Sequence, residues 1–87
     1  MTRDDIVRMT NEVFVESFEK DAAELQPAAH VFNDLGLDSL DTVDLVVALQ
    51  KKFAVKIRDD ARVRSIRTLD DIYRFIETIQ KEAEITP

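Results

Sequence analysis

Apolar residues recur along this chain at the three- and four-residue spacing of amphipathic helices, and very few residues interrupt that pattern. The 87 residues include one glycine and two prolines, which is too little turn material for an all-β fold. Cysteine is absent, so no disulfide can supplement the modest core of so short a chain. The pattern therefore predicts an all-α fold, with residues 1–87 as a single domain held by apolar packing.

Three long helices follow from this spacing, at residues 3–19, from Asp38 or Ser39 to Phe53, and from Thr68 to Glu82. A short helix or turn is expected at residues 59–64, and a long connection at residues 20–37. We therefore predict a bundle of three long helices plus one short helix, with residues 82–87 as a frayed tail. The expected core comprises Ile6, Val7, Met9, Val13, Phe14, Phe18, Leu25, Val31, Phe32, Leu35, Leu37, Leu45, Val46, Leu49, Phe53, Leu69, Ile72, Tyr73, Ile76 and Ile79.

The net charge of −6 argues against nucleic acid as a partner and favours a monomer that binds basic proteins. No apolar run is long enough for a membrane span, and the first residues lack the pattern of a secretory signal, so we expect a cytoplasmic protein. The charge is uneven: Asp21–Gln50 has acids but no Lys or Arg, whereas Lys51–Arg67 is mostly basic. Two surfaces with different partners would explain this, as would chance clustering on a solvated surface.

The second predicted helix has more apolar surface than one side of a bundle can bury. Leu40, Val43 and Val47 lie about 140° around the helical wheel from the stripe expected in the core. They stand beside Asp41 and Asp44, so exposed apolar residues with an acidic rim suggest docking of a partner with an apolar, basic groove. Packing under the long connection is the alternative: for Val43 the two readings are even, whereas Leu40 and Val47 favour docking.

Ser39 is expected in the first turn of the same helix, where backbone N–H groups are unpaired and the helix dipole would favour an attached phosphate. Asp38 is expected as the N-cap of this helix. For Ser39, spacing alone makes a capping role the simpler reading. A catalytic serine needs an adjacent base, and the single histidine, His30, lies nine residues earlier in a loop. The acids Asp34, Asp38, Asp41 and Asp44 also lack the spacing of a calcium loop. The sequence thus indicates a modifiable serine and no metal site or catalytic machinery.

The segment from Asp34 to Val46 resembles the signature of the acyl carrier protein family, with its Asp-Ser-Leu core at Asp38-Ser39-Leu40. The resemblance extends by pattern over residues 25–79 and implies the same bundle of helices. It implies that Ser39 carries 4′-phosphopantetheine, while Asp38 helps to position magnesium in the complex with the transferase that attaches this arm. Acyl groups would travel on the arm as thioesters, and the interior residues implied to receive them are Val43, Val46, Leu49, Phe53, Ile66 and Ile72.

A carrier of this kind is a substrate of a phosphopantetheinyl transferase and is not itself an enzyme. The resemblance implies docking of that transferase, and of acyl-processing enzymes with basic patches, at Asp34, Leu40, Asp41, Val43, Asp44 and Val47. Fatty acid synthesis or related lipid or polyketide synthesis is the expected setting. The alternative is a helical interaction module that kept the fold and lost the arm, which the intact Asp38-Ser39-Leu40 motif disfavours.

The chain departs from the family pattern after the second helix. The segment Lys51–Arg67 contains seven basic residues and two acids, whereas general fatty-acid carriers usually have acids in this part of the chain. Arg58 replaces a common proline. Val31-Phe32 reverses the usual order of the apolar pair in the loop. We therefore predict a specialised or secondary carrier, with its cargo left open.

Overall fold

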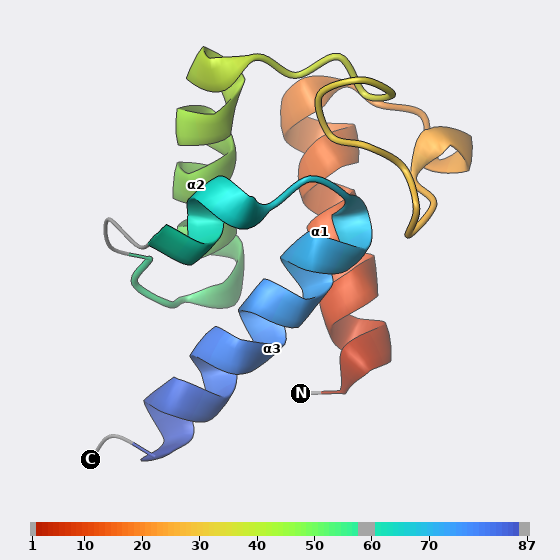
Figure 1. Ribbon diagram of the computed structural model, residues 1–87. Helices are drawn as coiled ribbons and strands as arrows, with labels where there is room; N and C mark the ends of the chain where they lie inside the picture. The colour runs from red at the N-terminus through yellow and green to blue at the C-terminus, as the bar shows by residue number, and fades with distance from the viewer. Residues whose placement is uncertain (1, 58–60, 86–87) are drawn as a thin grey trace.

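The computed structural model describes residues 2–57 and 61–85 and contains three long helices joined by loops (Figure 1). Helix α1 runs Arg3–Phe18, α2 runs Ser39–Phe53 and α3 runs Leu69–Ile85. Two short 3₁₀ turns lie between them, η1 at Ala22–Glu24 and η2 at Ala61–Ser65. No strand occurs within these described ranges, so the predicted all-α bundle is confirmed; η1 is an additional turn that the sequence analysis did not predict.

The first and last long helices each begin with a reciprocal pair of hydrogen bonds that satisfies the N–H groups of the first turn. In α1, Thr2 Oγ1 accepts from the N–H of Asp5 at 3.2 Å, and the Asp5 carboxylate accepts from the N–H of Thr2 at 3.2 Å. Thr68 and Asp71 form the same box at α3. These caps explain why the helices begin where they do.

The core lies where one apolar stripe from each helix meets the others, and α1 contacts both α2 and α3. The predicted stripes are largely confirmed, although Val46, Phe32 and three residues of the α1 stripe are only partly buried. Phe75, which the sequence analysis did not assign to the core, is 6% exposed. The buried residues are Ile6, Val13, Phe14, Leu25, Ala29, Val31, Leu35, Leu37, Leu45, Leu49, Phe53, Ile57, Leu69, Ile72, Tyr73, Phe75, Ile76 and Ile79, together with Thr10.

The long connection between α1 and α2 is held against the beginning of α3 by backbone hydrogen bonds (Figure 1). The N–H of Leu69 donates to the carbonyl of Ala29 at 3.1 Å, and the N–H of Asp70 donates to the carbonyl of Pro27 at 3.0 Å. In the other direction, the N–H of Val31 donates to the carbonyl of Arg67 at 2.8 Å. The loop thus satisfies donors that the first turn of a helix leaves unpaired, which explains how so long a connection packs closely on the bundle.

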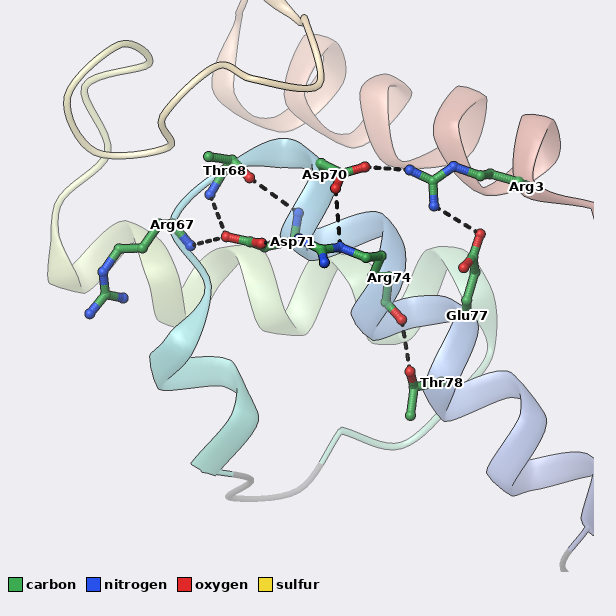
Figure 2. Close-up of polar contacts among 8 residues, drawn as sticks. All are labelled: Arg3, Arg67, Thr68, Asp70, Asp71, Arg74, Glu77 and Thr78. Carbon is green, nitrogen blue, oxygen red and sulfur yellow. Dashed lines mark hydrogen bonds and ion pairs between the residues drawn. The ribbon is translucent and has the colours of Figure 1, made fainter.

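An ionic network surrounds the start of α3 (Figure 2). The carboxylate of Asp71 accepts from the backbone N–H groups of Arg67 and Thr68, and Arg74 pairs with it at 2.7 Å. Arg74 also pairs with Asp70 at 3.1 Å, and Asp70 in turn pairs with Arg3 of α1. The network therefore joins the cap of α3 to the first turn of α1.

Helix α1 ends at Phe18, one residue before its predicted end, and two other elements differ more from the prediction. The short helix expected at residues 59–64 is a 3₁₀ turn that starts at Ala61, and residues 58–60 lie outside the described part of the chain. Helix α3 continues to Ile85, three residues beyond its predicted end at Glu82. Residues 86 and 87 are not described, so fraying of the tail and the extent of the domain over residues 1–87 stay predictions.

We predict that Asp71→Asn makes the protein less stable near neutral pH and less sensitive to acid. Burial opposes ionisation of Asp71, but hydrogen bonds from Arg67 and Thr68 and the charge of Arg74 outweigh it, so the pKa lies below the ordinary 3.8. A carboxyl group whose pKa is lower in the folded state stabilises the fold above the unfolded pKa. This contribution is lost as the pH falls through the folded pKa.

Urea unfolding followed by circular dichroism at neutral and acidic pH measures both effects. The variant should lose about 1 kcal/mol at neutral pH and show a smaller further loss in acid. The control is Asp4→Asn, which removes an exposed carboxylate without a hydrogen bond among the described residues. Equal acid sensitivity of wild type and Asp71→Asn would contradict the prediction.

Candidate functional site

The turn before α2 brings the chain from the core to the surface within three residues. Gly36 has a φ of 72°, in the left-handed region that glycine adopts without steric cost, and its N–H donates to the carbonyl of Phe32 at 3.1 Å. Leu37 is buried, at 5% exposed, and fixes the end of the loop in the core. Asp38 and Ser39 follow directly and are both exposed. The beginning of α2 is therefore displayed at the surface.

Asp38 is the N-cap of α2 and closes a reciprocal box with Asp41. Its Oδ1 accepts from the N–H groups of Leu40 and Asp41, both at 2.9 Å, while the Asp41 carboxylate accepts from the N–H of Asp38 at 3.1 Å. The hydroxyl and the N–H of Thr42 both donate to the Asp38 carbonyl, each at 3.2 Å. Asp38 thus fixes α2 to begin at the next residue, as predicted.

This cap corrects one expectation about the first turn. The sequence analysis assumed unpaired N–H groups around Ser39 that would favour a phosphate. That assumption is wrong for Leu40 and Asp41, because the carboxylate of Asp38 already accepts from both N–H groups. A phosphate joined to the Ser39 hydroxyl would still lie at the positive end of the helix dipole, but without a cradle formed by those donors.

Ser39 is the first residue of α2, and its side chain is exposed. In the described part of the chain, no hydrogen bond engages its hydroxyl, and the capping role expected as the simpler reading belongs to Asp38. The hydroxyl is therefore neither packed in the core nor needed for the helix. These are the properties required of a group that another protein must reach and modify.

The outward side of α2 carries the apolar residues that the helical wheel placed there. Leu40 is 76% exposed, Val43 is 62% exposed and Val47 is 42% exposed, so packing under the connection is excluded for all three. Asp44 is exposed beside them, and Asp41 is half-buried by its capping role. We call Leu40, Val43, Asp44, Val47 and Lys51 the outer face of α2.

Asp34 and His30 hold the loop that precedes the site. The carboxylate of Asp34 accepts from the N–H of His30 at 2.7 Å, so this exposed acid has a structural task besides any part in docking. His30 Nδ1 accepts from the N–H groups of Phe32 and Asn33 at 3.2 and 3.0 Å. The sequence analysis placed His30 in a loop, but the spacing of the residues gave no sign of these hydrogen bonds.

A small apolar cavity lies between α2, η2 and α3, with a volume of about 20 Å³. Val46, Leu49 and Ile66, which the resemblance implied as cargo-binding residues, line it. Phe53 and Ile72 are buried but do not line the cavity. The prediction of Val43 as an interior residue is wrong, because its side chain is exposed to solvent. A cavity of this size holds about one water molecule, so the interior is closed in this conformation.

The basic segment Lys51–Arg67 is partly used by the fold. Lys52 pairs with Glu12 of α1 at 2.6 Å; this hydrogen bond raises the pKa of Lys52 and lowers that of Glu12. The guanidinium of Arg67 donates to the carbonyls of Arg64 and Ile66 at 2.7 and 2.9 Å. Lys51 and Lys56 are exposed, whereas the side chains of Arg58 and Arg62 lie outside the described residues. Lys52 and Arg67 therefore take part in contacts within the fold, and the two explanations of the uneven charge both stay open.

No helix in the described part of the chain has the length and apolarity needed to cross a membrane. In a comparison with known families, a family model described as phosphopantetheine attachment site matches residues 12–76. That range includes α2, the loop before it, η2 and the beginning of α3. The match therefore covers every residue of the candidate site.

We predict effects of different size on stability for the two neighbouring residues at the start of α2. Asp38→Ala removes the acceptor for two N–H groups and should lower the free energy of unfolding by about 1 kcal/mol, within a range of 0.5–2 kcal/mol. Ser39→Ala should change it by less than about 0.5 kcal/mol, since the side chain is exposed. Thermal and urea unfolding of the two variants test this, and a larger loss for Ser39→Ala would show that the serine is structural.

Proposed function

Because the chain belongs to the phosphopantetheine attachment family, and is therefore a carrier with a covalent 4′-phosphopantetheine, we propose that Ser39 bears this group. The observation that carries the proposal is the exposed hydroxyl at the first residue of α2, free of capping and packing. It sits within the residues that the family model matches. A separate transferase can reach it without opening the fold.

Ser39 and Asp38 have different proposed roles in the attachment of 4′-phosphopantetheine. The serine oxygen loses its proton and forms a bond to phosphorus as the pyrophosphate bond of coenzyme A breaks. Adenosine 3′,5′-bisphosphate leaves, and 4′-phosphopantetheine stays on the protein. Asp38 holds the backbone of the first turn through two hydrogen bonds, which fixes the position of the serine oxygen. Its exposed carboxylate is also our candidate for helping to position magnesium in the transferase complex. The bound arm supplies a terminal thiol that carries acyl groups as thioesters.

We further propose that Leu40, Val43 and Val47, with the acids Asp34, Asp41 and Asp44, form the surface on which basic partner enzymes dock. Three large apolar side chains exposed along one helix suit a protein interface better than a free surface. Asp44 adds a charge that no described residue neutralises, which favours encounter with cations. Docking here would bring a partner's active site within one or two helical turns of Ser39.

The cargo is an acyl group of fatty acid, lipid or polyketide synthesis in this proposal, and the setting is the cytoplasm. The closed interior means that an acyl chain longer than a few atoms enters only if α2, η2 and α3 separate. The basic residues after α2 support a specialised rather than a general carrier. That role and the monomeric state both stay predictions.

Incubation with coenzyme A, magnesium and a broad-specificity phosphopantetheinyl transferase should add the mass of one phosphopantetheine group to the protein. Intact-mass spectrometry measures the gain, and Ser39→Ala should abolish it while the helical circular dichroism spectrum stays unchanged. Ser17→Ala is the matched control, because Ser17 is another exposed serine on a helix, and it should load normally. An unmodified wild-type protein would instead support an interaction module that lost its arm.

We expect Asp44→Lys to slow loading by about tenfold, because reversal of a charge at a docking surface disfavours a basic partner. Asp44 is the acid to change, since it is exposed and lies outside the capping box, whereas a change at Asp41 would also disturb the start of α2. The control is Asp4→Lys, the same change at an exposed acid of α1. Equal slowing of both variants would show a net-charge effect rather than docking on α2.

A further inference from the structure

The outer face of α2 changes its charge along its length. Asp44 lies near the Ser39 end and Lys51 near the other end, with Val47 between them. These positions are separated by three and four residues, so they form one stripe along the helix. Asp44 and Lys51 are therefore about 10 Å apart along the axis, at 1.5 Å per residue.

Neither charge is neutralised within the protein. Lys51 and Asp44 are exposed and form no ion pair within residues 2–57 and 61–85, unlike the neighbouring Lys52, which Glu12 of α1 engages at 2.6 Å. Lys51 lies in the last turn of α2, where a positive charge interacts favourably with the helix dipole. This interaction stabilises the helix only weakly. The pair is thus available to an external partner.

The same order of charges continues beside this face. A groove of about 620 Å³ lies between α1 and α2, with Asp41 and Asp44 toward one end of its α2 wall and Lys51 toward the other. Val47 and Ala48 form the middle of that wall. Glu16 of α1 and Lys52 of α2 also line the groove. Along the outer face of α2, a uniformly basic partner would meet attraction at Asp44 and repulsion at Lys51. The complementary surface carries cations opposite Asp44 and an acid opposite Lys51.

The footprint of a partner enzyme reaches this far. A standard interface covers about 800 Å² per partner, which corresponds to a patch about 30 Å across. Centred on Val43, in the middle of the exposed apolar residues, it includes Ser39 and extends past Lys51, which is about 12 Å away along the axis. A transferase with a footprint of this size and centre would also cover Lys51.

We propose that the phosphopantetheinyl transferase of the organism that encodes this chain presents an acidic side chain to Lys51 and cations to Asp44. Lys51 then sets the register of docking and selects this transferase over uniformly basic ones. The inference rests on the proposed attachment at Ser39 and adds the chemistry of the partner. A second copy of the chain is the other occupant that the opposite charges would fit.

The test compares the loading efficiency, kcat/KM, of wild type, Lys51→Gln and Lys51→Glu with that transferase. We expect Lys51→Glu to be slower by about tenfold, because like charges would then face each other, with Lys51→Gln between it and wild type. The difference should shrink at high salt, where exposed charges are screened. The matched control Lys81→Glu makes the same change at an exposed lysine near the end of α3 and should load like wild type.

Several results would overturn the proposal. Loading of Lys51→Glu at or above the wild-type rate would mean that no acid faces Lys51. An equal loss of loading efficiency in Lys81→Glu would show an effect of net charge rather than of contact with Lys51, and would also overturn the proposal. Sedimentation that shows a wild-type dimer, dissociated by Lys51→Glu, would assign the face to a second copy. Thermal unfolding of each variant separates a loss of helix stability from a loss of docking. A wild-type protein that gains no arm would overturn the proposed function itself, and this inference with it.

Discussion

The hydrogen-bonded box between Asp38 and Asp41 determines how the rest of this molecule presents its site. Because Asp38 accepts from two N–H groups, α2 begins at Ser39, and the serine is left outside the cap and outside the core. The same starting point sets the rotation of every later residue of α2 by the helical period. Leu45 and Leu49 then face the core, while Leu40 and Val47 face outward. One local interaction therefore displays both the serine and the surface beside it.

Helix α2 has one side that stabilises the fold and another that is exposed and available for recognition. Its inner side contributes buried residues to the core, its flank pairs with α1 through Lys52 and Glu12, and its outer face remains exposed. A carrier needs such a division, since it must stay folded while different enzymes contact the same helix. The exposed apolar residues gain nothing for the isolated fold, whereas the proposed docking of partner enzymes would give them a role.

The interior is arranged for closure, with a cavity of about 20 Å³ among apolar residues of α2, η2 and α3. The start of α3, by contrast, is fixed by the Thr68–Asp71 box, by backbone bonds to the loop and by ion pairs to Arg74 and Arg3 (Figure 2). These restraints join the first turn of α3 both to the loop and to α1.

The sequence by itself determined the helices, the stripes that pack in the core, the beginning of α2 at Ser39 and the exposure of Leu40 and Val47. All of these follow from local rules: the helical period, the capping preference of Asp38 and the turn at Gly36. Only the tertiary structure decided that Lys52 is engaged by Glu12, that His30 holds the loop and that Val43 faces solvent rather than cargo. Those outcomes depend on which residues distant in sequence meet in space, and helical periodicity contains no information about the neighbours that packing supplies.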